Sequence, residues 1–111
     1  MTRTELVAQT RRLVEEGDRL LVDPSMAGLR TWLQESDGLL AGAWGSMDRY
    51  HLAWLGVGRP RGQVRGRRMS TSEEAAYVRE VAGQKTAALR MSLKAAEEGM
   101  PFKGETEGAG R

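Results

Sequence analysis

The stretch from Trp32 to Tyr50, WLQESDGLLAGAWGSMDRY, constrains the fold of this chain more than any other. Apolar residues recur along it at helical spacing, and the pattern then stops at Gly45 and Ser46 and begins again. Glycine commonly follows the last residue of a helix, and serine is a favoured first cap of the next. The sequence therefore predicts a corner at which one helix ends and another begins.

A first helix is predicted upstream of this corner, over residues 2–22. Thr2 and Glu5 have the spacing of a capping box at its start. Glycine inside a helix is about 1 kcal/mol less favourable than alanine. Gly17 therefore indicates a bend or the close approach of another helix. The residues spaced three and four apart on its inward face are Leu6, Thr10, Leu13, Val14, Gly17, Leu20 and Leu21.

A second helix is predicted over residues 24–44. Asp23 is its expected N-cap, with Pro24 at the first helical position, because the fixed φ of proline suits that place. The connection from the first helix is so short that the two must fold back as an antiparallel hairpin. The expected inward face of the second helix is Leu29, Trp32, Leu33, Ser36, Leu40, Ala43 and Trp44.

A short third helix is predicted after the corner, ending near Gly56 or Gly58. Ser46 is its expected N-cap, with Asp48 in the first turn, where a carboxylate suits the positive end of the helix dipole. The side chains expected to face inward are Met47, Tyr50, Trp54 and Val57.

The last helix is predicted to run to about Glu98. Two capping boxes are available for its start, one from Ser70 with Glu73 and one from Thr71 with Glu74. Its expected buried stripe is Ala75, Val78, Val81, Ala82, Leu89, Leu93 and Ala96.

These helices predict a single all-α domain over residues 1–98, a small antiparallel bundle of about four helices. With 111 residues, of which 40% are hydrophobic and 29% charged, the chain has enough apolar surface for one core. An Arg/Gly-rich loop is expected over residues 58–70, where helical spacing is lost. Residues 99–111 are expected to form a flexible, disordered tail, because KGETEGAGR has nothing to bury.

The net charge of +2 hides an uneven distribution of charge. Residues 59–68 hold five arginines and no acidic residue, whereas residues 1–58 carry a net charge of −2 and residues 69–111 carry −1. Guanidinium groups on a glycine-rich loop suit phosphates, an acidic protein surface or simple solvation, and the sequence leaves these three readings open. The candidate interaction residues are Arg59, Arg61, Arg65, Arg67 and Arg68.

The composition also bears on location. The chain has no cysteine, which excludes a disulfide framework and cysteine-ligated zinc and favours a reducing compartment. No apolar run near the N-terminus resembles a signal peptide, and the longest apolar stretch, Leu39 to Trp44, is far shorter than the roughly 20 residues of a membrane span. We therefore expect a cytoplasmic protein that does not enter a membrane.

His51 is the single histidine and the first candidate for acid–base chemistry. Asp48 lies one turn earlier on the same helical face, and Ser46 is near in sequence. However, a nucleophile needs a base that is oriented by a third group, and Ser46 already has a sufficient role as an N-cap. One histidine and scattered carboxylates also form no metal-ligand pattern. We expect no enzyme activity, no cofactor and no metal.

Several residues around the corner carry a family resemblance. They are Glu16-Gly17, Leu20-Leu21, Trp32, Glu35, Leu39-Leu40, Gly45-Ser46 and Tyr50. This pattern, over roughly residues 10–55, resembles small uncharacterised bacterial helical proteins that occur alone or beside effector domains of bacterial conflict systems. The resemblance implies a packing unit and no catalytic residue.

The expected function follows from the corner and the helix faces. Residues expected to build the core and corner are Trp32, Leu40, Trp44, Gly45, Ser46, Tyr50 and Trp54. Four amphipathic helices of unequal length have more apolar edge than a small bundle needs, which favours a protein partner or a homo-oligomer. The sequence predicts a non-catalytic protein–protein interaction or adaptor module of a bacterial or phage system. The alternative is a small nucleic-acid-binding accessory protein that acts through its arginines.

Overall fold

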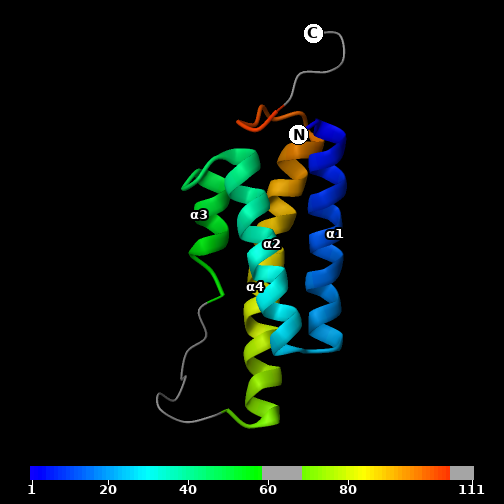
Figure 1. Cartoon of the computed structure of the whole chain (residues 1–111), viewed down its shortest axis with the longest axis vertical. Helices are drawn as coiled ribbons and strands as arrows, with labels where there is room; N and C mark the ends of the chain where they lie inside the picture. The colour runs from blue at the N-terminus through cyan, green and yellow to red at the C-terminus, as the bar shows by residue number, and fades with distance from the viewer. Residues whose placement is uncertain (59–68, 106–111) are drawn as a thin grey trace.

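A computed structural model of the chain describes residues 1–58 and 69–105. In these residues the structure has no strand and four α-helices: α1 (Arg3–Val22), α2 (Met26–Trp44), α3 (Arg49–Leu55) and α4 (Thr71–Glu97). Figure 1 shows α1 and α4 side by side in opposite directions, with α2 crossing them and the short α3 beside the far end of α2. The prediction of a small all-α bundle is confirmed. None of the described helices is both long enough and apolar enough to cross a membrane.

The start and inward face of α1 agree with the sequence. The Thr2 hydroxyl accepts a hydrogen bond from the Glu5 amide at 3.1 Å, and the Glu5 carboxylate accepts one from the Thr2 amide at 2.9 Å. This is the predicted capping box. The buried residues of α1 all belong to the predicted face, and they are Leu6, Thr10, Leu13, Val14, Gly17 and Leu20.

Gly17 marks a close approach of three helices. A Cβ atom placed on Gly17 would overlap the hydroxyl of Thr86 in α4 and would lie 2.8 Å from the indole ring of Trp32 in α2. One turn earlier, the Trp32 indole N–H donates to the Leu13 carbonyl oxygen at 2.8 Å. The helices therefore meet here because α1 lacks a side chain at residue 17, which confirms the close approach that the glycine indicated.

The predicted start of α2 is wrong by two residues. Ser25 is the N-cap, and its hydroxyl accepts from the Gly28 amide at 3.0 Å. Asp23 belongs instead to the end of α1, because its amide donates to the Arg19 carbonyl oxygen at 2.8 Å. Pro24 then lies in the link and not in a helix. The link is nevertheless short enough for the predicted antiparallel hairpin.

The end of α2 is the predicted one. Gly45 follows the helix with a φ of 111°, a value that favours glycine, and its amide donates to the Ala41 carbonyl oxygen at 3.1 Å. The corner is therefore a true break between α2 and α3.

The predicted start of α3 is wrong. Asp48 is the N-cap and its carboxylate accepts from the Tyr50 amide at 3.5 Å, whereas Ser46 lies in an exposed turn. Met47 has a φ of 65° and is 60% exposed, so its predicted inward position is also wrong. The Asp48 amide donates back to the Gly45 carbonyl oxygen, and this extra turn uses the residues that were expected to begin the helix.

The capping box of α4 is formed by Ser70 and Glu73, the first of the two candidates. The buried stripe includes polar residues that the sequence did not indicate, above all Lys85. Its ammonium group donates to the Trp54 carbonyl oxygen at 2.6 Å and lies 4.0 Å from the centroid of the Trp54 ring. Lys85 thus connects α4 to α3.

The segment after α4 packs on the bundle. Phe102 is 7% exposed and belongs to the core, and the Gly104 amide donates to the Ala43 carbonyl oxygen at 2.8 Å. Figure 1 shows this segment running from the end of α4 over the end of α2, close to the N-terminus. The packed unit therefore extends to residue 105, which corrects the expected start of the tail at residue 99. Residues 106–111 lie outside the described residues.

Candidate binding surfaces

The residues predicted to build the core lie where the helical spacing placed them. Trp32, Leu40, Trp44 and Trp54 are all buried. Tyr50 is half-buried, and its ring centroid lies 4.6 Å from that of Trp44. The rings of Trp44 and Tyr50 thus pack against each other, whereas Trp32, although buried, also lines a cleft at the surface.

The structure does not describe the arginines of the predicted loop. Arg59, Arg61, Arg65, Arg67 and Arg68 lie outside the described residues. The residues that the structure does describe contain eleven basic and fourteen acidic residues, a net charge of −3. The chain therefore combines an acidic bundle with one strongly basic stretch of sequence.

His51 is buried beneath the corner, and its carboxylate partner is Asp37. Its Nε2 lies 2.6 Å from a carboxylate oxygen of Asp37 in α2, and its Nδ1 accepts from the Met47 amide at 2.9 Å. Because Nδ1 accepts, the neutral ring carries its proton on Nε2 and donates it to Asp37. Asp48, the carboxylate one turn earlier on the same helical face, caps α3 instead.

Both nitrogens of His51 are therefore engaged in holding the corner. A general base needs a ring nitrogen within reach of a substrate proton. Here each nitrogen already has a partner from the protein, one on α2 and one in the turn before α3. This arrangement fastens α2 to α3. Among the described residues, no three side chains of the metal-binding types lie close enough to hold an ion.

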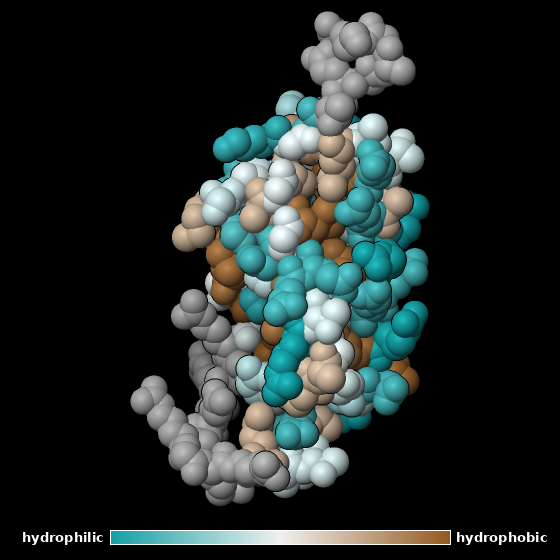
Figure 2. All heavy atoms as spheres, viewed as in Figure 1, coloured by the Kyte–Doolittle hydropathy of each residue, from teal (hydrophilic) through white to brown (hydrophobic). Residues whose placement is uncertain are grey.

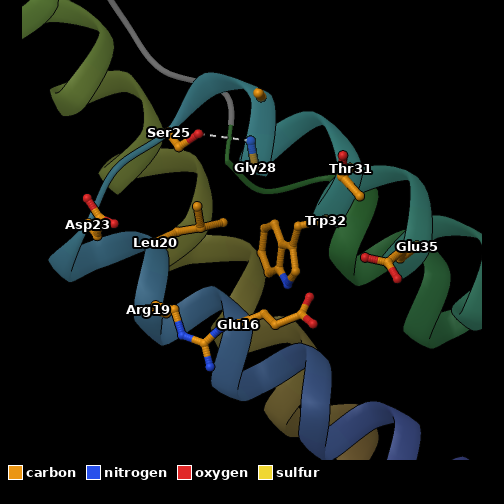
Figure 3. Close-up of a pocket in the computed structure, with 10 residues that line it drawn as sticks. Glu16, Arg19, Leu20, Asp23, Ser25, Gly28, Thr31, Trp32 and Glu35 are labelled. Carbon is orange, nitrogen blue, oxygen red and sulfur yellow. Dashed lines mark hydrogen bonds between the residues drawn. The ribbon is translucent and has the colours of Figure 1, made fainter.

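A cleft of about 510 Å³ lies between the second half of α1 and the first half of α2. It is within the range of volumes that protein ligand sites usually have. Figure 3 shows Leu20 from α1 and Trp32 from α2 between the two helices, with charged side chains on either side. The cleft lies toward the end of the bundle where the link between α1 and α2 turns.

The floor of the cleft is apolar and closely packed. Leu20 and Trp32 are buried and line it from below. Gly28 lies above Leu20, and a Cβ atom placed there would come within 3.3 Å of a Leu20 methyl group. Ala27 and Thr31, which line the same edge, are also small and are exposed. Because these residues are small, the α2 side of the cleft forms a low edge, and the backbone of a partner can come close to it.

The rim of the cleft carries more acid than base. Glu16 lies on α1 and Glu35 on α2, and the guanidinium of Arg12 is 3.4 Å from the first and 3.6 Å from the second. These distances are longer than those of strong charge-assisted hydrogen bonds, and the three side chains are partly exposed, so the pairs hold the carboxylates weakly. Within the described residues, Arg19 and Asp23, which also line the cleft, form no ion pair.

Sequence reasoning missed the cleft because no local signal marks it. Glu16, Asp23 and Glu35 are spread over two helices and a link, and only the hairpin brings them to one rim. The exposure of Met91, by contrast, could have been predicted from the sequence, because this residue lies outside the apolar stripe predicted for α4.

In comparisons with known proteins, no family model, no curated protein and no solved structure matched this chain. The resemblance to small bacterial helical proteins thus stays a prediction.

Proposed function

We propose that this protein is a non-catalytic protein–protein interaction or adaptor module, which binds an amphipathic helix of a partner in the cleft between α1 and α2. The observation that carries the proposal is the combination of an apolar floor, a low edge and a charged rim between two helices. An amphipathic helix binds in such a groove by inserting apolar side chains between the two existing helices.

The floor supplies the main part of the expected affinity. A leucine-sized side chain that is fully buried against Leu20 and Trp32 contributes about 1.5–3 kcal/mol. Because Ala27, Gly28 and Thr31 are small, the helix that carries this side chain can lie close to α2. These are properties of a surface that receives another protein element.

The rim indicates the charge of the partner. Around the cleft the three carboxylates of Glu16, Asp23 and Glu35 outnumber the two guanidinium groups, which belong to Arg19 and to Arg12 at the rim. A partner helix with lysine or arginine beside its apolar anchor would gain favourable contacts there. Partly exposed charges mainly accelerate association and select partners, so we expect binding that weakens moderately, but does not disappear, as salt rises.

We also propose where the protein acts, in the cytoplasm and within a bacterial or phage system. The absence of cysteine supports a cytoplasmic location. The resemblance over residues 10–55 supports a bacterial or phage system, of the kind that takes part in defence.

Site-specific photo-cross-linking tests this function. A photoreactive amino acid replaces exposed Thr31 on the rim and, as a matched control, exposed Gln84 on α4. Irradiation of cells of the source organism that contain the full chain should give one defined protein adduct from position 31 and none from position 84. If position 31 gives no adduct, or both positions give the same ones, the cleft is not the binding surface.

A second candidate function is nucleic-acid binding through the basic stretch. The observation in its favour is the +5 charge of residues 59–68 in a chain whose described part is acidic. Five cations predict an affinity whose logarithm falls with the logarithm of salt at a slope of up to about −4.5 on duplex DNA.

Fluorescence anisotropy with a labelled duplex and a labelled single strand tests this second function. Replacing Arg65, Arg67 and Arg68 with alanine should flatten the slope by about 2–3 units. The matched control replaces three arginines of the described surface. If neither nucleic acid binds at a salt concentration of about 50 mM, where screening is weak, this function is excluded.

A further inference from the structure

A second hollow, of about 350 Å³, lies at the other end of the bundle, between α3 and the end of α4. Its lining residues are Tyr50, Met91, Lys94, Ala95, Glu98 and Met100. Met91 is 57% exposed and Met100 is 39% exposed, so two large apolar side chains face solvent here. Figure 2 shows hydrophobic side chains reaching the surface among polar ones on the side of the molecule that carries α3.

Methionine suits a contact surface because its flexible thioether adapts to the shape of a partner. Met91, Lys94, Ala95 and Glu98 follow one another at helical spacing, so they share one face of α4. Ala95 is buried at the base of the hollow, so the accessible part of this face consists of Met91, Lys94 and Glu98, with Met100 beside them.

Two opposite charges on this face have no ion-pair partner among residues 1–58 and 69–105. Lys94 and Glu98 lie one turn apart on α4, yet in the described residues neither side chain forms an ion pair or a hydrogen bond. Lysine placed before glutamate at this spacing is the less favourable order for a pair within one helix. Both charges are therefore available to another molecule.

The four outer residues of this face form a patch that is complementary to itself, and they are Met91, Lys94, Glu98 and Met100. If two copies of α4 cross in opposite directions about a two-fold axis midway between Lys94 and Glu98, Lys94 of one copy lies opposite Glu98 of the other, and the reverse pair forms as well. The same axis brings Met91 of each copy near Met100 of the other. A closed dimer of this kind requires that one patch complement itself, and this patch does so in both charge and apolar surface.

We propose that a second copy of this chain is the occupant of this face, in a symmetric dimer with two Lys94–Glu98 ion pairs between protomers and the methionines between them. Only six residues line the hollow, far fewer than the roughly 20–30 residues per side of a standard interface, so the expected dissociation constant is about 10–500 µM. The cleft between α1 and α2 lies toward the opposite end of the bundle and stays open, so the dimer presents two clefts.

Sedimentation of the full chain at concentrations from about 10 µM to 1 mM tests the proposal. The wild type should pass from monomer to dimer over this range. Lys94→Glu places two acids on each face and Glu98→Lys places two bases, so each variant alone should dimerise at least about tenfold more weakly.

The charge variants provide their own controls. An equal mixture of Lys94→Glu and Glu98→Lys should form a heterodimer, and the double variant that carries both changes should dimerise like the wild type. Glu80→Lys, the same charge change at an exposed position elsewhere on α4, should also leave dimerisation unchanged. A wild type that is monomeric up to about 1 mM, or single variants and a mixture that dimerise like the wild type, would overturn the proposal.

Discussion

The contact around Gly17 and the corner from Gly45 to Asp48 hold the bundle together in different ways. At Gly17 the helices touch because α1 has no side chain, and the Thr86 hydroxyl and the Trp32 ring fill the space. At the corner the backbone is irregular, and His51 holds it through one hydrogen bond from the turn and one to α2. The first region is a steric fit, whereas the second is a polar fastening.

The difference shows what each kind of region requires. The steric fit tolerates no added atom, but its surroundings are ordinary helix. The corner tolerates solvent on one side, since Met47 is largely exposed there, but it depends on a buried polar group whose partner comes from another helix. Changes at the steric fit should therefore affect global stability most, while changes at the fastening should act mainly on local opening.

The largest expected effect comes from the packed core itself. Leu40 is 1% exposed, and Leu40→Ala should lower the free energy of unfolding by about 2–5 kcal/mol, because it removes buried methyl groups and leaves a cavity. Urea unfolding measures this change. Leu52→Ala is the matched control, because Leu52 is 46% exposed and its loss should cost about 0.5 kcal/mol or less. An unchanged urea midpoint for Leu40→Ala would mean that this side chain is not in the core.

A single methyl group at residue 17 sharpens the steric side of the comparison. Alanine has the higher helix propensity by about 1 kcal/mol, yet Gly17→Ala should destabilise the protein by about 1–3 kcal/mol, because the new Cβ overlaps Thr86. Gly38→Ala is the matched control, since nothing lies within 4 Å of a Cβ there, and it should stabilise by up to about 1 kcal/mol. Thermal unfolding of both variants measures these changes in stability. Equal changes of the same sign in the two variants would contradict the close approach at residue 17.

The polar fastening should give a smaller effect. Asp37→Ala removes the acceptor of the His51 ring proton, and because the Asp37 side chain is 51% exposed the expected loss is about 0.5–1.5 kcal/mol. The clearer result is faster hydrogen exchange at the Met47 amide, which donates to the same ring. Glu15→Ala, at an exposed position on α1, should leave that exchange rate unchanged. Unchanged exchange in Asp37→Ala would show that Asp37 does not orient the ring.

The smallest effect concerns the start of α1 at low pH. Backbone and side-chain hydrogen bonds from Thr2 lower the pKa of Glu5 below its ordinary value of 4.5. A carboxyl group whose pKa is lower in the folded state stabilises that state above its unfolded pKa, and this contribution is lost as pH falls through the folded pKa. The Thr2 amide resonance should therefore shift as pH falls below 4.5, and Glu5→Gln should remove that shift.

The sequence predicted the helices and their inward faces well, because helical periodicity is a local signal. A glycine inside a helical pattern indicated a bend or a close approach at Gly17, and the structure shows the close approach. It misplaced two N-caps because Ser25 and Asp48 compete with neighbours that cap equally well in isolation. In each case, which of the two neighbouring residues caps the helix depends on where the preceding turn ends.

The candidate surfaces were less predictable because they depend on tertiary contacts. The Asp37–His51 pair spans 14 residues and two helices, so no spacing rule finds it. The rim of the cleft joins Glu16 to Glu35 only after the hairpin has formed. Phe102 was assigned to the tail because a single aromatic residue after a helix carries no periodic pattern.

The central claim is that the cleft between α1 and α2 receives a protein partner, and a matched pair of substitutions tests it most directly. Ala27→Trp fills the cleft, whereas Ala76→Trp adds the same side chain to another exposed alanine, on α4. The protein cross-linked through position 31 is purified and titrated against both full-length variants by calorimetry. We predict that Ala27→Trp weakens binding at least about tenfold, a change of about 1.4 kcal/mol, and that Ala76→Trp binds like the wild type. Equal affinities for the two variants would contradict the claim.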